Sequence, residues 1–274
     1  MTLRGVPWVL GLIARGQFKV LWVETHFRLY RSRWNAKLEA NLANQPRPSI
    51  PASTRIRLET QHPVAYQSPD HLVPWGTQYD NSTHGKFLLH MEELIQRTQP
   101  KGLKRAMDLG CSGGGLVHDL LRMGWVAVGL EGSDFSLKHQ RAHWPQLGRK
   151  HLFTCDIGKP FRLLDQETVH QADLITMWEV LEHIRTDELP TLFENILNHL
   201  KPGGYFVAST TSEPDIHEGV ELHQTKMTNS EWRQWVAKHR PELEWVELGL
   251  EYYQFVRYNQ ERSVLSYRRK ATSA

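Results

Sequence analysis

The sequence contains little cysteine: two residues in 274, Cys111 and Cys155. They do not form a Cys-x-x-Cys pair, and two cysteines cannot build a disulfide framework, so the composition favours a reducing, intracellular compartment. Long apolar runs are also missing. In the first forty residues the longest uncharged stretch is Gly5–Ala14, whereas a membrane-spanning helix needs about 20 residues. No cleavage site typical of a signal peptide follows this stretch. The sequence therefore predicts a cytoplasmic globular protein.

A strong net charge of either sign is absent as well, because the formal net charge is only +3. The charge is unevenly spread: residues 1–63 contain ten Lys/Arg and three Asp/Glu, and the remainder contains 23 basic and 27 acidic residues. A body with a slight acidic excess does not predict a nucleic-acid-binding surface. Nucleic acid is therefore not an expected partner, and any attraction to polyanions lies in the N-terminal part.

The chain divides into three expected regions. Residues 1–43 alternate apolar and basic character and predict a basic amphipathic helical segment. Two interpretations of this segment stay open. It packs on the main domain or on a second subunit, or it makes a peripheral contact with a membrane surface, with basic side chains facing anionic lipid. Residues 44–75 hold several prolines and predict an extended connector. Residues 76–274 form the main domain.

Strand and helix patterns alternate through the main domain. Short apolar stretches predict strands that end at Leu109, Glu131, Asp156 and Trp178. The helical patterns between and after them cover residues 114–122, 135–144 and 186–200, the last with Thr186 as its expected N-cap. Another helix is expected from Thr228, where Thr-x-x-Glu forms a capping box, and the chain closes with a predicted antiparallel pair of strands. Such alternation predicts a Rossmann-like α/β fold whose parallel sheet has helices on both faces and binds ligands beyond the carboxyl ends of its strands.

A glycine-rich turn, “DLGCSGGG” from Asp108 to Gly115, follows the first of these strands. No Gly-Lys-Ser/Thr follows it, which excludes a P-loop, and the G-x-G-x-x-G spacing of dinucleotide-binding turns is absent. The carboxylate of Asp108 is unfavourable beside phosphate but favourable beside a cation. S-adenosylmethionine (SAM) carries an ammonium and a sulfonium group and no phosphate, so it fits this turn.

Two further acids stand at the next two expected strand ends. Glu131 is placed to accept hydrogen bonds from the ribose hydroxyls of SAM, and Asp156 to receive the adenine amino group, with Ile157 packed on the ring. Three acids at three successive strand ends, in this order, strengthen the assignment. The expected cofactor-binding residues are Asp108, Gly110, Cys111, Ser112, Gly114, Glu131, Gly132, Asp156, Ile157 and Trp178.

These motifs resemble those of the class I SAM-dependent methyltransferases over residues 76–274. “MDLGCSGGG” is similar to the first motif of that family, with Ser112 in place of a commoner glycine, and “VGLEGSD”, “TCDIGKPF” and “LKPGGYF” are similar to later ones. The resemblance implies a seven-stranded, mostly parallel sheet whose last strand is antiparallel, here with an N-terminal helical extension. It implies an enzyme that transfers a methyl group from SAM, and it does not identify the acceptor.

The stretch “MWEVLEHI” follows the fourth expected strand and carries the candidate acceptor site. If a helix begins near Glu179, then Glu179, Glu182 and His183 share one face of it. Together with His223, or alternatively His217, these side chains are suited to ligate Mg²⁺ or Mn²⁺. The pattern resembles the ubiquinone-biosynthesis O-methyltransferases and the small-RNA 2′-O-methyltransferases, which implies a metal that binds adjacent hydroxyl oxygens of the acceptor. Two other interpretations stay open: His183 or His223 acts as a general base without a metal, or the stretch is purely structural.

The expected function is O-methylation of a hydroxyl on a sugar, a glycan or another small molecule, by in-line transfer from SAM. “PWGTQYDNSTHGKF” and “ELHQTKMTNSEW” are among the stretches that resemble bacterial methyltransferases encoded with surface-polysaccharide genes, of the type 11/12 kind. A basic N-terminus also suits an acceptor carried on a membrane lipid. The alternatives are a metal-dependent quinone- or RNA-type O-methyltransferase, a nicotinamide-dependent oxidoreductase and a non-catalytic scaffold. The sequence does not define the oligomeric state.

Overall fold

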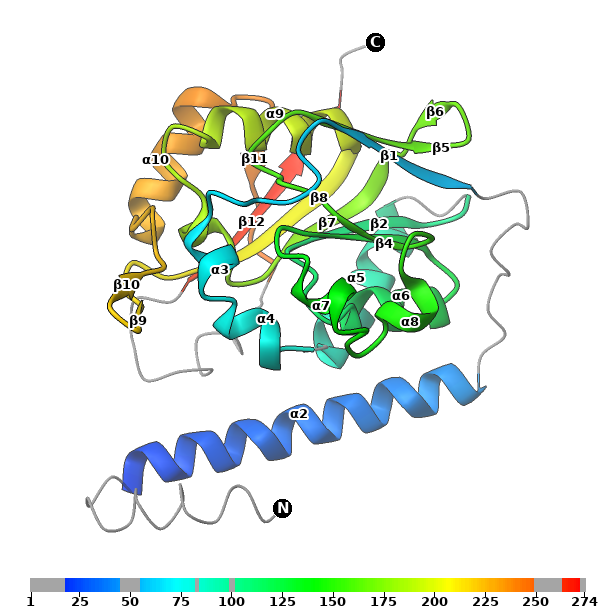
Figure 1. The fold of residues 1–274 in the computed structure, drawn as a ribbon. Coiled ribbons are helices and arrows are strands. Elements are labelled where there is room, and N and C mark those ends of the chain that lie inside the picture. Colours follow the sequence, from blue (N-terminus) through cyan, green and yellow to red (C-terminus); the bar gives the residue numbers. More distant parts are fainter. Residues whose placement is uncertain (1–17, 45–54, 82–83, 99–101, 249–262, 272–274) are drawn as a thin grey trace.

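The computed structural model describes residues 18–44, 55–81, 84–98, 102–248 and 263–271 (Figure 1). The first 17 residues of the predicted N-terminal segment, and residues 45–54 of the predicted connector, lie outside these ranges. Within them the chain forms a seven-stranded sheet flanked by helices, a smaller three-stranded sheet and a two-stranded ribbon of β9 (Ile216–His217) and β10 (Val220–Glu221).

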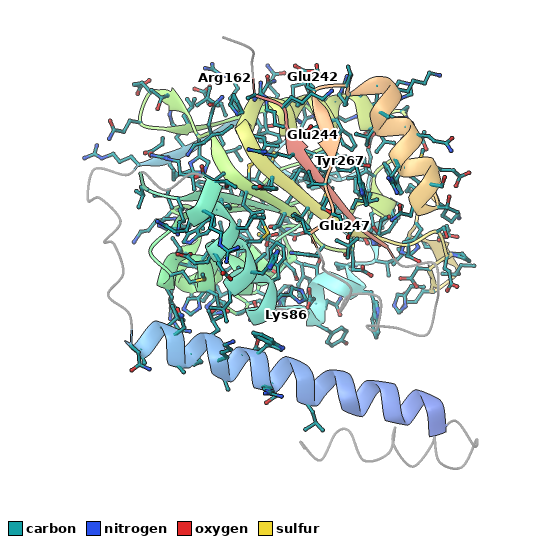
Figure 2. The ribbon with its side chains drawn as sticks, turned by 180° about the vertical axis from the view of Figure 1, so that it is seen from behind. Lys86, Arg162, Glu242, Glu244, Glu247 and Tyr267 are labelled. Atoms are coloured by element: carbon teal, nitrogen blue, oxygen red, sulfur yellow. The ribbon has the colours of Figure 1, made fainter. Side chains whose placement is uncertain are left out.

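The large sheet has the strand order β11-β12-β8-β7-β2-β3-β4. Its strands are β2 (Arg105–Leu109), β3 (Val126–Glu131), β4 (Leu152–Thr154), β7 (Ala172–Met177), β8 (Leu200–Thr210), β11 (Leu243–Trp245) and β12 (Ser263–Arg269). Five neighbouring strands of this sheet are parallel to one another, namely β4, β3, β2, β7 and β8. Strand β12 is antiparallel to both of its neighbours, β8 and β11. The Rossmann-like fold and the antiparallel closing pair are therefore confirmed. Figure 2, seen from behind, shows Tyr267 of β12 on this antiparallel edge.

Helices cover both faces of the large sheet (Figure 1). Along β2, Ala106 faces the cluster formed by α5 (Gly85–Thr98) and α6 (Gly115–Arg122), and Met107 faces the cluster formed by α9 (Leu189–His199) and α10 (Asn229–His239). Because successive residues of a strand point to opposite faces, strands covered on both sides are apolar throughout. The apolar stripe expected on the third helix is confirmed, with Leu189, Leu192, Phe193 and Ile196 fully buried.

The helix expected over residues 135–144 is wrong. Two single turns replace it, α7 (Phe135–Lys138) and α8 (Trp144–Leu147). Between them Gln140 and Ala142 have φ values of 49° and 50°. These lie in the left-handed region, which a continuing right-handed helix excludes.

The expected N-cap at Thr186 is also wrong, because α9 begins at Leu189 and is preceded by Glu188. The hydroxyl of Thr186 is 2.9 Å from that of Thr225 and hydrogen bonds with it instead. Pro190 stands in the first turn of α9, where its missing N–H leaves no helical hydrogen bond unmade.

The N-terminal segment is helical over its described part, as α2 (Phe18–Asn44). Its C-terminal half packs on the main domain: Leu38 is 1% exposed, and the Glu39 carboxylate pairs with the Arg122 guanidinium at 2.6 Å. Gly85 of α5 permits the close approach, since an added Cβ would lie 2.8 Å from the backbone oxygen of Trp34. Figure 2 shows Lys86 of α5 directed toward α2. For this half the contacts favour packing on the domain, and the membrane-surface contact stays a prediction. No helix among the described residues combines the length and the apolar character needed to cross a bilayer.

The predicted connector is more ordered than expected. It contains β1 (Ile56–Thr60), which pairs antiparallel with β5 (Phe161–Asp165), which in turn pairs with β6 (Thr168–Val169). An ion pair of 2.8 Å between the Arg105 guanidinium and Asp165 joins this small sheet to β2. After β1 the chain forms two short helices, α3 (Pro69–Leu72) and α4 (Trp75–Tyr79). The prolines at 46, 48 and 51 fall outside the described residues, and the rest of the region is part of the folded body.

Substitution of Thr228 tests the capping box at the start of α10. The Thr228 hydroxyl accepts a hydrogen bond from the Glu231 N–H, and the Glu231 carboxylate accepts one from the Thr228 N–H at 2.8 Å. Thr228→Ala should lower the free energy of unfolding by about 1 kcal/mol in urea denaturation. Ser230→Ala, an exposed change in the same turn, is the control and should stay within about 0.5 kcal/mol of wild type. An equal loss in both variants would contradict the role of the cap.

Candidate cofactor and acceptor site

The glycine turn joins β2 to α6 and depends on backbone conformations that favour glycine. Gly110 and Gly114 have φ values of 76° and 82°, and Ser112 has a φ of 45°. A Cβ on Gly110 would lie 2.3 Å from Cγ2 of Val180, so this position has no room for a side chain. The N–H groups of Gly110 and Cys111 donate to the carbonyl of Leu130 at 2.7 and 3.0 Å. The turn is therefore held against the carboxyl end of β3.

Asp108 lies near the end of β2 and is 4% exposed. Its Oδ1 accepts a hydrogen bond of 2.7 Å from the hydroxyl of Thr176 on the neighbouring strand β7. Burial raises the pKa of Asp108 to about 7; the Thr176 hydrogen bond opposes this rise, and the negative charges of Asp80 and Glu131 add to it. A buried carboxyl with an elevated pKa gains from a cationic partner, as the charge argument from the sequence requires.

Glu131 ends β3 and holds the glycine turn through its carboxylate. Oε2 accepts from the Ser112 N–H at 2.7 Å and Oε1 from the Ser133 N–H at 3.0 Å. Burial raises the pKa of Glu131 to about 7, although both backbone hydrogen bonds act in the opposite direction. Gly132, the next residue, accepts a hydrogen bond from the Ala65 N–H at 2.9 Å.

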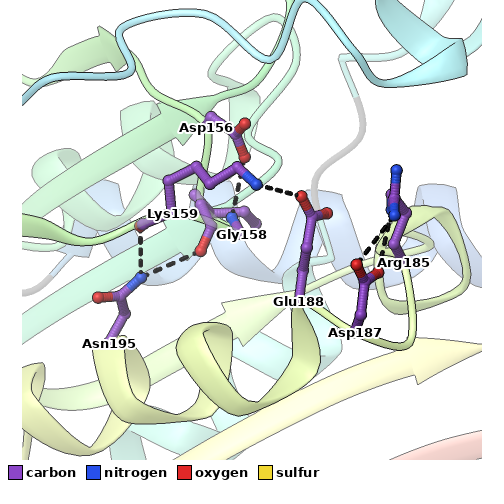
Figure 3. A network of polar contacts seen from close by, with 8 residues as sticks. Asp156, Gly158, Lys159, Arg185, Asp187, Glu188 and Asn195 are labelled. Carbon is purple, nitrogen blue, oxygen red and sulfur yellow. Dashed lines mark hydrogen bonds and ion pairs between the residues drawn. The ribbon is translucent and has the colours of Figure 1, made fainter.

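Asp156 lies two residues beyond the end of β4 rather than at it. Its Oδ1 accepts from the Gly158 N–H at 3.0 Å, and burial together with nearby Glu188 raises its pKa. Figure 3 shows Glu188 beside this turn, paired with the Lys159 ammonium at 2.7 Å. Asn195 donates to the backbone carbonyls of Ile157 and Lys159 at 3.1 and 2.8 Å. The adenine-side loop is thus anchored to α9.

Two other expected cofactor residues are well buried or well packed. Cys111 is 6% exposed, and burial raises the pKa of its thiol well above the ordinary value, so it is not a reactive nucleophile. Trp178 is half-buried and meets Phe87 edge-to-face, with ring centroids 4.9 Å apart. The structure places every expected cofactor residue at the carboxyl ends of four neighbouring strands, β7, β2, β3 and β4.

Residues 65–81, which include α3 and α4, lie over the glycine turn. The Ser112 hydroxyl donates to the Asp80 carbonyl at 2.8 Å, and the Arg141 guanidinium donates to the same carbonyl and to the Ser112 hydroxyl. A Cβ on Gly113 would meet Asn81 within 2.5 Å. The end of this segment belongs to the stretch “TQYDNSTH”, residues 77–84, whose polar residues predict a lid over cofactor and acceptor. Arg141 was not expected as part of the site, because its contacts join residues 61 and 29 positions apart and leave no local pattern in the sequence.

Three of the expected acceptor-site residues come together. Glu182, His183 and His223 each offer a ligand atom within 4.8 Å of the others, and the two imidazole rings are 4.9 Å apart at 85°. Glu182 is fully buried. One carboxylate and two imidazoles form a donor set suited to Mn²⁺, Fe²⁺ or Zn²⁺, with coordination positions left for substrate oxygens. The residues present therefore fit a divalent cation.

The outer nitrogen of each imidazole is already engaged. Nδ1 of His223 faces the backbone carbonyl of Glu213 and donates to it, which leaves Nε2 with the lone pair. Nδ1 of His183 is 2.9 Å from Oδ2 of Asp70 in an ion pair. Burial acts to lower the pKa of His183, but Asp70, Glu182 and Asp215 together raise it to about 9. The acids around His183 thus favour the protonated, positively charged form of its imidazole.

Glu179 and His217 do not join the cluster. The expected helical face is wrong, because Glu179 has a φ of 53° and is followed by a single 3₁₀ turn, Leu181–His183. The carboxylate of Glu179 accepts a hydrogen bond of 2.7 Å from the Ser209 hydroxyl instead. His217 stacks on Trp75 of α4, with ring centroids 4.5 Å apart.

Comparison with known proteins places the chain in a family. Residues 83–264 match the profile of a family described as a methyltransferase domain. The ubiquinone biosynthesis O-methyltransferase of Vibrio cholerae serotype O1 is 31% identical over 122 residues, which are 44% of this chain and 48% of that protein. The protein of that name from Acinetobacter baumannii is 29% identical over 122 residues, 44% of this chain and 50% of the relative.

The chain thus spans about half the length of the curated relatives it matches. Among solved structures, a SAM-dependent methyltransferase from Clostridium acetobutylicum aligns with a TM-score of 0.49 and 16% identity, over 74% of this chain and 96% of that one. Because the family profile covers more than half of the chain, and the sheet has the expected strand arrangement, the chain belongs to the methyltransferase-domain family, with the class I, SAM-dependent fold.

Proposed function

We propose that the protein is a SAM-dependent O-methyltransferase that methylates one of two adjacent hydroxyl groups. The observation that carries the proposal is the cluster of Glu182, His183 and His223. Glu182 and His183 lie in the 3₁₀ turn that follows β7, and His223 comes shortly after β10. In the sheet β7 lies beside β2, the strand that leads into the glycine turn. A methyl donor bound at the turn and an acceptor bound at the cluster would therefore meet at one edge of the sheet.

The cofactor half of the site is built for a ligand that is positive at one end. Asp108 is the proposed partner of the SAM ammonium group, and Glu131 the partner of the ribose hydroxyls. The adenine amino group is assigned to Asp156. The family match favours methyl transfer over the alternative of a nicotinamide-dependent oxidoreductase.

The acceptor half orients a hydroxyl group and eases loss of its proton. When bound, a divalent cation would act as a Lewis acid that lowers the pKa of the acceptor hydroxyl. Glu182, His183 and His223 are its proposed ligands. Residues 65–81, which cover the glycine turn, would limit the access of water, and methyl transfer then depends on alignment of the acceptor oxygen with the sulfonium. Without a metal, Nε2 of His223 is the better-placed proton acceptor, because its Nδ1 donates to a backbone carbonyl.

The acceptor class follows from the donor set. Two adjacent oxygens can both ligate one cation, and this arrangement occurs in catechols and in vicinal diols of sugars. The curated relatives are named for ubiquinone biosynthesis, which supports a quinone precursor as the acceptor. The resemblance to methyltransferases encoded with polysaccharide genes, and the basic N-terminal segment, support a sugar, including one carried on a lipid.

An acceptor panel combined with removal of Glu182 tests the function. The wild-type chain should methylate a catechol or a vicinal sugar diol with SAM and Mn²⁺, detected by mass spectrometry, and excess EDTA should abolish turnover. Glu182→Gln should lose Mn²⁺ binding and turnover while keeping its affinity for S-adenosylhomocysteine (SAH), since it acts only in the acceptor half. Full activity in EDTA would refute the metal-dependent mechanism, and methylation of monohydroxy acceptors alone would refute the adjacent-hydroxyl requirement.

Replacement of Glu131 tests the cofactor half. Glu131→Gln removes the charged acceptor proposed for the ribose hydroxyls, so the affinity for SAH should fall by about tenfold or more, measured by calorimetry. Glu244→Gln, an exposed change on β11, is the control and should bind SAH like wild type. Thermal unfolding of each variant separates loss of the ligand contact from loss of the fold. An unchanged affinity in Glu131→Gln would overturn this assignment.

The pH dependence of SAH binding tests Asp108. The SAH ammonium needs the ionised carboxylate, and the pKa of Asp108 in the ligand-free protein is about 7. Protonation below this pKa must be reversed on binding, so the affinity should rise as the pH rises, by about tenfold between pH 6 and pH 8. In Asp108→Asn the affinity should be lower throughout and the slope shallower, with Glu131 still contributing. A wild-type affinity that is constant over this range would contradict the role of Asp108.

A further inference from the structure

Asp70 lies on the N-terminal side of the glycine turn in the sequence and contacts the proposed acceptor cluster. Its Oδ2 is 2.9 Å from Nδ1 of His183, although 113 positions separate the two residues in the sequence. The His183 side chain is 15% exposed and that of Asp70 32% exposed, so the pair lies at the margin of the buried site. The negative charge of Asp70 also contributes to the raised pKa of Glu131 in the cofactor half.

The short helix α3 holds Asp70 in place by local contacts. Ser68 caps the helix, its hydroxyl accepting a hydrogen bond from the Asp70 N–H at 3.3 Å, and Pro69 occupies the first turn. The Ala65 N–H donates to the carbonyl of Gly132 at 2.9 Å, which ties the chain before α3 to the end of β3. The carboxylate is therefore delivered by a segment that is itself attached to the cofactor half.

We propose that Asp70 is a positioning residue: its carboxylate holds Nδ1 of His183 and so presents Nε2 to the cation shared with Glu182 and His223. The inference rests on the proposed metal-dependent function. A histidine ligand needs a fixed ring orientation and a fixed tautomer, and a carboxylate or carbonyl at the outer nitrogen supplies both. The backbone carbonyl of Glu213 does this for His223. For His183 the contact at Nδ1 is the 2.9 Å ion pair with the Asp70 carboxylate, and no backbone carbonyl bonds to this nitrogen among the hydrogen bonds of the described residues.

A purely stabilising ion pair is the competing explanation. Such a pair would change the free energy of unfolding and leave the affinity for a cation unaltered. Ion pairs with partial exposure contribute little to stability, so a large effect on the cation with a small effect on unfolding separates the two explanations.

The test measures Mn²⁺ binding to the full chain by electron paramagnetic resonance of free Mn²⁺, without cofactor or acceptor. Asp70→Asn should weaken Mn²⁺ binding by about tenfold, because the amide keeps an oxygen near Nδ1 but loses the charge, and Asp70→Ala should weaken it further, up to about 100-fold. Thermal unfolding should stay near wild type in Asp70→Asn. Asp187→Asn is the matched control: Asp187 is exposed, pairs with Arg185 and lies four residues from His183, and the change should leave Mn²⁺ binding unaltered.

The outcomes separate failure of the inference from failure of the function. If both Asp70 variants bind Mn²⁺ as tightly as wild type while Glu182→Gln does not, the metal site stands and the role of Asp70 is refuted. If Mn²⁺ binding falls only in proportion to a loss of folded protein, the ion pair is merely stabilising, which also refutes the inference. A wild-type chain that binds no Mn²⁺ overturns the metal-dependent function and the inference with it. The inference is supported if Mn²⁺ affinity falls in Asp70→Asn and falls further in Asp70→Ala while both variants stay folded.

Discussion

The hydrogen bond between the Ser112 N–H and the buried Glu131 carboxylate is the constraint on which the rest of the site depends. A carboxylate taken out of water needs donors around it, and here two backbone amides supply them. Because one of these amides belongs to the glycine turn, the turn is drawn onto the end of β3. The N–H groups of Gly110 and Cys111 bond to the same strand end. An acid expected only to meet a ligand therefore also shapes the loop that would hold it.

Acidic side chains predominate in both halves of the site. Asp108 and Glu131 line one half, and Asp70, Glu182 and Asp215 surround His183 in the other. The first half favours a cationic cofactor, and the second favours a positive charge at or beside the imidazole. The segment of residues 65–81 joins them, since the Asp80 carbonyl receives the Ser112 hydroxyl and Asp70 reaches His183. Acids from several different elements therefore lie at one edge of the sheet.

Local patterns predicted the parallel strands of the large sheet and the position of Asp108 and Glu131 at two of their ends, because each depends on residues close in sequence. The buried strands are continuous apolar runs, and the capping box at Thr228 lies within four residues. Prediction failed where distant contacts decide the backbone. Glu179 leaves the helical region and meets Ser209 of β8, so the shared helical face does not form. Thr186 bonds to Thr225 rather than capping α9. Asp70 stands in a recognisable helix start, Ser-Pro-Asp, but nothing near it in the sequence points to His183.

The strand β1 gives the region before the family match an architectural role. The matched residues begin at position 83, whereas β1 covers Ile56–Thr60 and pairs along the whole of β5. A shortened polypeptide that starts at residue 83 would lack β1, so the backbone N–H and C=O groups on one side of β5 would be unpaired. An unpaired strand edge can pair with a strand of another molecule and so cause self-association. It would also expose the surface of α5 against which Leu38 packs. A recombinant form of this protein that is to resist aggregation therefore needs the residues that precede the family match.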